Sequence, residues 1–210
     1  MYELHRAVGA VLRSIEYPNI EVLLDSACGG EGKRLRLYGG SGGETPGGDS
    51  LLASVNAALI VNGEIGVVIG IELSDVRPIY LCAKVFATAL SNYHSHHSRE
   101  PRIPLAERMM FIQVIQYPDG EPQIWFETAA RRKARGTYRP PGYVHLEREI
   151  SRLLRDTKSR VWRYVFHYGF SKSFDLKGSD AKALKKEILD FLPLVPNGQP
   201  LSTQPVKPIC

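Results

Sequence analysis

The strongest constraint on the fold is an Asn62-Gly63 pair that lies between two apolar runs. Residues 55–61 precede the pair and residues 65–72 follow it, and both runs are rich in Val, Ile and Leu. Asn and Gly both tolerate the positive φ that a tight two-residue turn requires, so the pattern predicts a β-hairpin. The second run is apolar almost throughout, and we expect it to be a central strand that is buried on both faces.

Helical patterns flank this hairpin on both sides. Apolar residues recur at helical spacing over residues 4–15, and Pro18 ends the pattern, which predicts an amphipathic helix. Pro78 suits the first turn of a second helix that runs to about Tyr93, because the missing N–H of proline would be unpaired there in any case. The hairpin therefore lies between two helices.

The rest of the chain continues this mixture of helices and strands. Residues 29–48 contain nine of the nineteen glycines and are expected to form a loop, whose middle at 34–38 alternates as an exposed strand would. We expect strands at 21–25, 109–115, 124–126 and 161–168, the last with Trp162, Tyr164, Phe166 and Tyr168 on one face, and helices at 147–156 and 179–192.

This order of elements predicts an α/β fold with a central mixed β-sheet flanked by helices. We expect one domain over residues 1–192, followed by a Pro-rich tail over 193–210 that is extended or frayed. A chain of 210 residues is long enough to bury a substantial core in a single domain.

Several classes of protein are excluded by simple patterns. No apolar run reaches the ~18 residues of a membrane helix, and no signal peptide is evident at the start of the chain. The three cysteines are far apart, which favours free thiols in a reducing cytoplasm. The glycine-rich stretch lacks a phosphate-binding P-loop and a dinucleotide-binding glycine motif.

The charge is concentrated in one part of the chain. Eleven basic and three acidic residues lie between Arg131 and Arg163, although the whole chain carries a net charge of only +5. A dense basic run is followed by a helix with arginines at helical spacing, and both suit a polyanion such as DNA. The basic candidates are Arg131, Arg132, Lys133, Arg135 and Arg139 in the run, and Arg148, Arg152 and Arg155 on the helix. Glu149 lies off the arginine stripe, so we expect salt bridges to explain only part of it.

The segment Val55–Pro78 resembles the core of restriction-endonuclease-like proteins, the PD-(D/E)XK nuclease superfamily. Members place an acid at the start of the first hairpin strand, and a Glu-x-Lys or Glu-x-Glu near the end of the second. A helix then follows. The resemblance is close over about residues 54–90 and looser over 1–115. It implies a restriction-endonuclease-like fold and Mg²⁺-dependent cleavage of double-stranded DNA.

The motif positions are only partly filled in this chain. The first acid position falls on Asn56, the second on Gly70 and the third on Glu72, so one of three carries a carboxylate. Shifting the register by two residues makes Glu72 the acid and leaves the base unassigned, in which case Lys84 on the next helix is the candidate for a migrated lysine. Catalysis would then depend on Glu72, Lys84 and Asn56.

Mg²⁺ prefers carboxylate oxygens, and two adjacent strands can bring two carboxylates to one ion. Candidate metal ligands beside Glu72 are Asp25, Asp75 and Glu3, although a role as a helix cap is the simpler interpretation of Asp75. The residues His94 to His97 lack other ligands at suitable spacing, so a metal site there is not favoured.

Two functions therefore remain open from the sequence. One is a Mg²⁺-dependent deoxyribonuclease centred on Glu72. The other is a DNA-binding or partner-assembly module that keeps the nuclease fold without hydrolysis. The resemblance also implies a homodimer, because a two-fold protein suits a palindromic site, or a second subunit that completes the centre. Neither function involves a membrane partner.

Overall fold

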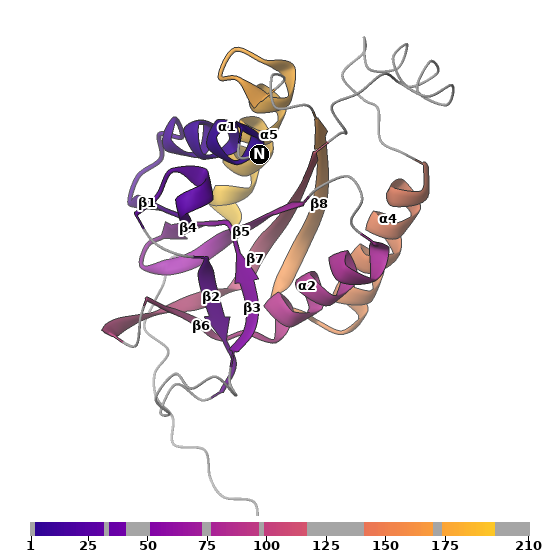
Figure 1. Ribbon diagram of the computed structural model, residues 1–210. Coiled ribbons are helices and arrows are strands. Elements are labelled where there is room, and N and C mark those ends of the chain that lie inside the picture. The colour runs from indigo at the N-terminus through magenta and orange to yellow at the C-terminus, as the bar shows by residue number, and fades with distance from the viewer. Residues whose placement is uncertain are drawn as a thin grey trace, which may run out of the picture.

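The computed structural model describes residues 3–31, 34–40, 51–72, 77–96, 99–116, 141–169 and 174–195. Helices are interspersed with strands along this part of the chain, and four strands, β2 to β5, follow one another without a long helix between them (Figure 1). The elements are α1 (Glu3–Arg13), β1 (Ile20–Leu24), η1 (Ser26–Cys28), β2 (Leu35–Tyr38), β3 (Leu51–Val55), β4 (Ala57–Val61), β5 (Glu64–Glu72), α2 (Pro78–Leu90), β6 (Tyr93–His96), β7 (Arg99–Gln116), α4 (Pro141–Asp156), β8 (Val161–Gly169), α5 (Ser179–Phe191) and η4 (Leu192–Leu194).

The strands form one mixed sheet at the centre of the fold. Its main part runs β1-β4-β5-β7-β8, in which β5–β7 and β7–β8 are parallel and the other pairs are antiparallel. The first half of the long strand β7 also pairs with β6, and β2 and β3 continue that branch. The α/β class with a mixed central sheet, which the sequence predicts, is confirmed.

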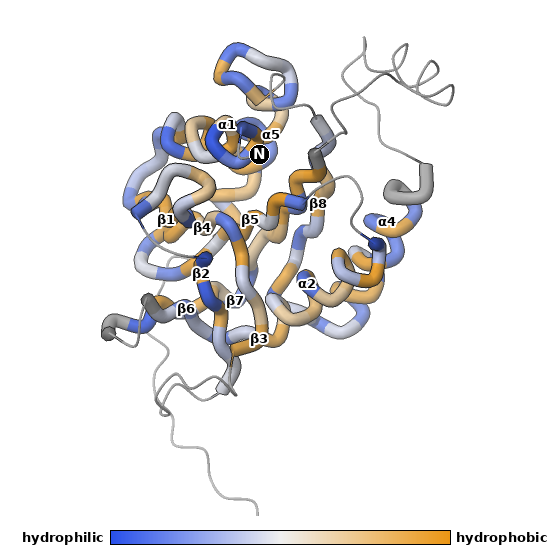
Figure 2. Tube along the Cα trace, viewed as in Figure 1, coloured by the Kyte–Doolittle hydropathy of each residue, from blue (hydrophilic) through white to orange (hydrophobic). Residues whose placement is uncertain are grey.

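Helices cover both faces of the main sheet, and each face has its own core. Helices α1 and α5 pack on one face with a cluster that includes Leu12 and Phe191, and α2 and α4 pack on the other with a cluster that includes Leu81 and Ile150 (Figure 1). Figure 2 shows that apolar residues gather along the central strands, while polar residues mark the outer turns of the helices. None of the helices in the described parts of the chain combines the length and apolarity needed to cross a bilayer.

The predicted hairpin is confirmed. Asn62 and Gly63 have φ values of 53° and 87° and join β4 to β5. All residues of β5 between its two terminal glutamates, Glu64 and Glu72, are buried, as the apolar pattern predicts. The strand therefore runs through the centre of the sheet and delivers Glu72 to its end.

Some local expectations were wrong. The second helix ends at Leu90, because Tyr93 enters β6 and stacks on Tyr38 with ring centroids 5.6 Å apart. The strand expected within 34–38 exists as β2, but Leu35 and Leu37 are buried instead of exposed, since β2 lies between β3 and β6. The helix expected at 147–156 begins six residues earlier, at Pro141.

The aromatic face predicted for the strand at 161–168 is only partly correct. Tyr164, Phe166 and Tyr168 form a row on the α2 and α4 side, with successive ring centroids 5.1 Å and 5.8 Å apart. A register shift opposite Trp162 breaks the alternation, because Met109 pairs with Val161 and Met110 with Arg163. Trp162 instead contacts Phe191 of α5, on the other face.

Two further predictions lie partly or wholly outside the described residues. The strand expected at 124–126 falls outside them, as does the predicted tail beyond residue 195. Folded structure continues past residue 192 through η4 to Val195, which is buried against Gly66.

Candidate functional site

Asn56 lies at the bend between β3 and β4, where the chain passes from one branch of the sheet to the other. Its side-chain Oδ1 accepts a hydrogen bond from the Ile71 backbone N at 2.8 Å, and its Nδ2 donates to Asp25 Oδ2 at 2.9 Å. Its backbone O also accepts from the Asp25 backbone N at 2.9 Å. The buried amide therefore ties the end of β1 to β5, and both of its ends are occupied.

Asp25 is almost fully buried beside this bend. Its Oδ1 accepts from the Cys28 backbone N at 2.9 Å and so caps η1, while its Oδ2 accepts from Asn56. Burial, followed by the nearby Asp25 charge, raises the pKa of Cys28 far above that of an ordinary thiol. Cys28 is therefore held as a neutral thiol and is unsuited to act as a nucleophile.

Glu72 and Lys84 form an ion pair at the end of β5. The Lys84 Nζ of α2 donates to Glu72 Oε1, and each side chain is 21% exposed. Lys84 also crosses Gly70, since a Cβ placed on Gly70 would lie 3.2 Å from its Cδ and 3.6 Å from its Nζ. The lysine thus occupies the space that a side chain at position 70 would need.

Gln113 of β7 lies beside Gly70 in the parallel register and is fully buried. Its Oε1 accepts a hydrogen bond from the Tyr164 hydroxyl of β8. Its Nε2 is also buried and has no hydrogen-bond partner among the described residues. Burial, followed by the charges of Cys82, Glu147 and Glu72, raises the pKa of Tyr164 beyond the range of an ordinary phenol, so its hydroxyl remains a donor.

His5 on the first turns of α1 connects these groups electrostatically. Burial lowers the pKa of His5 below its ordinary value, while the Asp25 and Glu72 charges oppose this shift and Arg34 and Lys84 add to it. The α1 helix therefore brings an imidazole within electrostatic reach of both polar pairs. We call Asp25, Asn56, Glu72 and Lys84 the hairpin-end cluster.

The structure brings together four of the residues predicted for the site, but as two separate polar pairs. Asp25 bonds to Asn56, and Glu72 pairs with Lys84. Glu3, another predicted metal ligand, is exposed in the first turn of α1. In this part of α1, it is His5 that interacts electrostatically with Asp25 and Glu72. Asp75 lies outside the described residues.

The oxygen atoms of Asn56, Asp25 and Glu72 do not fit the Mg²⁺ site that the resemblance implies. The Asn56 oxygen is held by a backbone N–H, both Asp25 oxygens accept hydrogen bonds, and the Glu72 carboxylate faces an ammonium group. Within the described residues, no three His, Cys, Asp or Glu side chains form a group that could hold a metal ion. A hard divalent ion needs several accessible oxygen ligands, and this arrangement offers few.

A cavity of about 240 Å³ opens beside the Asn56–Asp25 pair. Its walls come from the start of α1, from η1 and from the residue before β2, with Asp25 and Asn56 contributing the buried part. We call it the arginine cavity, and its polar lining consists of His5, Arg6, Asp25, Ser26, Arg34 and Asn56.

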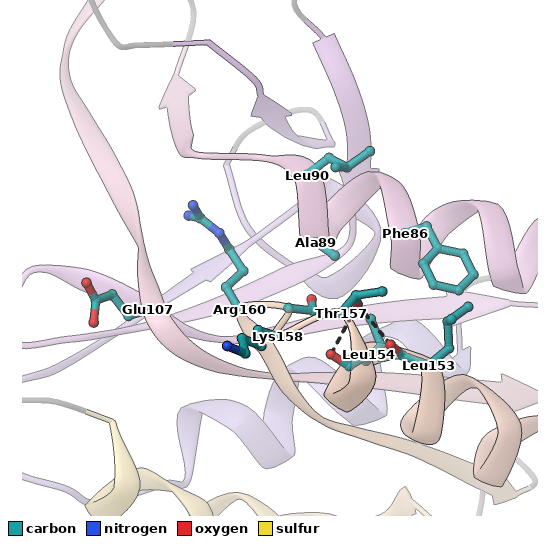
Figure 3. A pocket seen from close by; sticks show the side chains of 10 residues that line it. Phe86, Ala89, Leu90, Glu107, Leu153, Leu154, Thr157, Lys158 and Arg160 are labelled. Carbon is teal, nitrogen blue, oxygen red and sulfur yellow. Dashed lines mark hydrogen bonds between the residues drawn. The ribbon is translucent and has the colours of Figure 1, made fainter. Parts of the chain in front are cut away.

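A larger cavity of about 870 Å³ lies at the other end of the sheet, between the last turns of α2 and α4 (Figure 3). Phe86, Leu90 and Leu153 contribute apolar walls, and Arg160 lies on its polar side. Arg160 is engaged structurally, because its Nη2 donates to Asn92 Oδ1 at 2.9 Å. This cavity is therefore separate from the hairpin-end cluster.

The arginine stripe on α4 is partly engaged by the neighbouring acid. Arg152 pairs with Glu149 at 3.1 Å, and the Arg148 Nε lies 3.9 Å from the same carboxylate. Glu149 therefore engages two of the three arginines although it lies off their stripe, while Arg155 is exposed and makes no ion pair with another described residue. The basic run containing Arg131, Arg132, Lys133, Arg135 and Arg139 lies outside the described residues.

Among the residues His94 to His97, the structure shows a structural role for His94. His94 is buried in β6, and its Nδ1 lies 2.8 Å from the Arg36 carbonyl oxygen. His97 lies outside the described residues.

Sequence reasoning missed Gln113, Tyr164, Arg6 and Arg34 as neighbours of the site. Gln113 did carry a usable signal, because it is the one polar residue within the apolar run 109–115. The two arginines carried none, since they belong to segments that meet only in the folded chain.

No family model, curated protein or solved structure matches this chain.

Proposed function

We propose that the protein is a restriction-endonuclease-like protein that binds double-stranded DNA and does not hydrolyse it with its own chain. The order α1, β1, β4, β5, α2, β7, with polar residues at the ends of the hairpin strands, supports this proposal. It agrees with the order of elements that the resemblance implies, a helix before the hairpin and another directly after it.

The observation that carries the proposal is the position of Lys84. Its ammonium group lies over Gly70, where the resemblance places a metal-binding acid, and it pairs with Glu72. The pairing with Lys84 offsets the charge of Glu72, so this position lacks the net negative charge that attracts a divalent cation, and it keeps a partly exposed ammonium group that can contact a phosphate. The Lys84 side chain of α2 occupies the space where a carboxylate at position 70 would lie, and this favours phosphate binding over metal binding.

The charges elsewhere in the chain agree with a DNA partner. The exposed Arg155 of α4 is available for a backbone phosphate, and the basic run at 131–139 adds five cations without an acid. Arginine and lysine contacts to phosphates release counterions, which produces affinity that depends on salt rather than on sequence.

The alternative is a Mg²⁺-dependent deoxyribonuclease centred on Glu72, with the missing carboxylates supplied by a second subunit or a second copy of the chain. A plasmid-nicking assay of the full chain with Mg²⁺ and with Mn²⁺ separates the two functions. We expect no nicking with either metal. Metal-dependent nicking that Glu72→Ala abolishes would overturn the proposal and establish the nuclease.

DNA binding is measured in the same buffers with EDTA in place of the metal. We expect a duplex to be retained in EDTA, and Lys84→Gln to weaken binding about tenfold, as for the loss of one charge-assisted hydrogen bond. The matched control is Lys186→Gln, because Lys186 is an exposed α5 lysine that also has an acidic partner, Asp190. Equal losses for the two variants, or no retention of DNA by the wild type, would contradict the proposal.

A further inference from the structure

The arginine cavity contains more positive charge than its internal contacts use. Arg6 and Arg34 are exposed at its walls, and neither forms an ion pair or hydrogen bond with another described residue. Arg13 of α1 differs from them because it donates to the carbonyl oxygen of Gly29, the residue after η1. Two guanidinium groups thus line one small concave site, and neither is bonded to any part of the chain that the structure describes.

The acid in the same cavity is already satisfied. Asp25 is 1% exposed, and its two oxygens accept from the Cys28 backbone N and from Asn56 Nδ2, each at 2.9 Å. These two donors offset much of its charge, so its repulsion of an incoming anion is weaker than that of a free carboxylate. The two arginines therefore dominate the electrostatics of the cavity.

The remaining walls add polar groups that suit an oxyanion. Ser26 presents an exposed hydroxyl, and His5 presents a half-buried imidazole. The volume of about 240 Å³ is below the ~300–1,000 Å³ of pockets for drug-sized ligands. A cavity of this size suits a small anion such as a phosphate group. Arginine has five donors in a planar fork that matches phosphate oxygens.

We propose that the arginine cavity is a binding site for a phosphate group, held by Arg6 and Arg34 with the Ser26 hydroxyl beside them. The group comes from a nucleic-acid strand or from a free phosphate or mononucleotide. The site is distinct from Lys84, because the Asn56–Asp25 pair borders the cavity while Lys84 lies over Gly70. It does not depend on DNA binding, since inorganic phosphate alone can fill it.

The test measures inorganic phosphate binding to the full chain by calorimetry and by the shift of the melting temperature, against potassium chloride at equal ionic strength. A ligand that binds only the folded state raises the melting temperature by an amount that grows with its concentration relative to Kd. We expect a phosphate-specific shift in the wild type and a weakening of about tenfold in Arg6→Gln and in Arg34→Gln, as for the removal of one charge-assisted hydrogen bond.

Arg36→Gln is the matched control. Arg36 is an exposed arginine two residues after Arg34, but it does not line the cavity. Both cavity variants should fold normally, since their side chains are exposed, and their melting temperatures without phosphate verify this. No phosphate-specific shift in the wild type, or an unchanged shift in the Arg6→Gln/Arg34→Gln double variant, would overturn the proposal.

Duplexes with a 5′-phosphate and with a 5′-hydroxyl identify the source of the phosphate. If the wild type binds the phosphorylated duplex more tightly and Arg34→Gln abolishes that difference, the phosphate belongs to a strand end. If Arg34→Gln weakens the binding of both duplexes equally, the phosphate is an internal one. Phosphate binding without any effect on DNA supports a free phosphate or mononucleotide. In that last case the cavity proposal stands even if DNA binding fails.

Discussion

At the residue scale, Asn56 shows how one buried amide can join two parts of the fold. An amide can donate and accept at once, so Asn56 bonds both the Ile71 N–H and the Asp25 carboxylate. An aspartate at this position could accept from Ile71, but it could not donate to Asp25 unless it were protonated. An amide at position 56 therefore suits a neighbouring buried acid better than a carboxylate does.

Asn56→Asp is expected to lower the free energy of unfolding by about 3–5 kcal/mol at neutral pH, because it buries a second negative charge against Asp25. Part of this loss should be recovered in mildly acidic buffer, where the two carboxyls can share a proton. Urea unfolding at several pH values measures the effect. Asn56→Ala is the control, since it removes the hydrogen bonds without adding charge, and an Asp variant as stable as the wild type would contradict this interpretation.

His5 provides a pH prediction whose sign follows from its lowered pKa. Between the ordinary value of 6.5 and the lower value in the folded state, the unfolded chain binds more protons than the folded chain. The free energy of unfolding is therefore expected to fall as the pH decreases below about 6.5. Above that pH, His5 is neutral in both the folded and the unfolded chain and adds no pH dependence. His5→Gln should reduce the slope in that window, and an unchanged slope would rule out His5 as its source. Paired urea titrations of wild type and variant measure it.

At the element scale, the parallel strands β7 and β8 carry a polar pair inside an apolar layer. Tyr164 donates to Gln113, while the Gln113 Nε2 is buried without a hydrogen-bond partner among the described residues. A buried donor without an acceptor costs free energy, so this pair is a weak point of the core rather than a stabilising feature.

We expect Gln113→Leu and Tyr164→Phe each to destabilise the protein by about 1–3 kcal/mol, because each leaves its partner buried and unsatisfied. The double variant removes every polar atom of the pair and is expected to be close to the wild type in stability. Denaturant midpoints of the four proteins form a double-mutant cycle. Additive losses in the double variant would show that the two side chains do not act as a pair.

The same two strands show why periodicity alone placed Trp162 on the wrong face. A strict alternation assumes an unbroken ladder, but the register shift between Met109 and Met110 inserts one residue opposite them. Such a bulge reverses the direction of the side chain at that position. The bulge depends on the partner strand, which lies about fifty residues earlier in the chain.

At the scale of the whole molecule, the described arginines that are proposed to bind DNA all lie on α4. Helix α4 covers the face of the sheet opposite to α5, so exposed cations on the two helices can be compared as separate surfaces (Figure 1). Arg155 has no ion pair with another described residue, while Arg148 and Arg152 share Glu149.

Replacing Arg148, Arg152 and Arg155 together by Gln is expected to reduce the slope of log affinity against log salt by about 0.9 for each DNA phosphate that the variant no longer neutralises. Fluorescence anisotropy with a labelled duplex at several salt concentrations measures that slope. The control replaces Lys177, Lys182 and Lys186, which are exposed on or beside α5. An equal change in the control would mean that net charge, and not the α4 surface, determines binding.

Most elements of the described fold could be predicted from the sequence, since their signals are local. The Asn62-Gly63 turn and the apolar run of β5 each act within a few residues, and both were confirmed. The end of α2 was predicted less well, because the entry of Tyr93 into β6 depends on its packing against Tyr38.

By itself, the sequence determined the α/β class and the hairpin, since residue identity and short-range spacing suffice for these. Only the tertiary structure decided that Asp25 meets Asn56, that Lys84 crosses Gly70, and that α1 brings Arg6 close to Arg34. These partners are separated by 31, 14 and 28 positions in the chain. Their contacts depend on strand register and helix packing, which no local pattern of residues specifies.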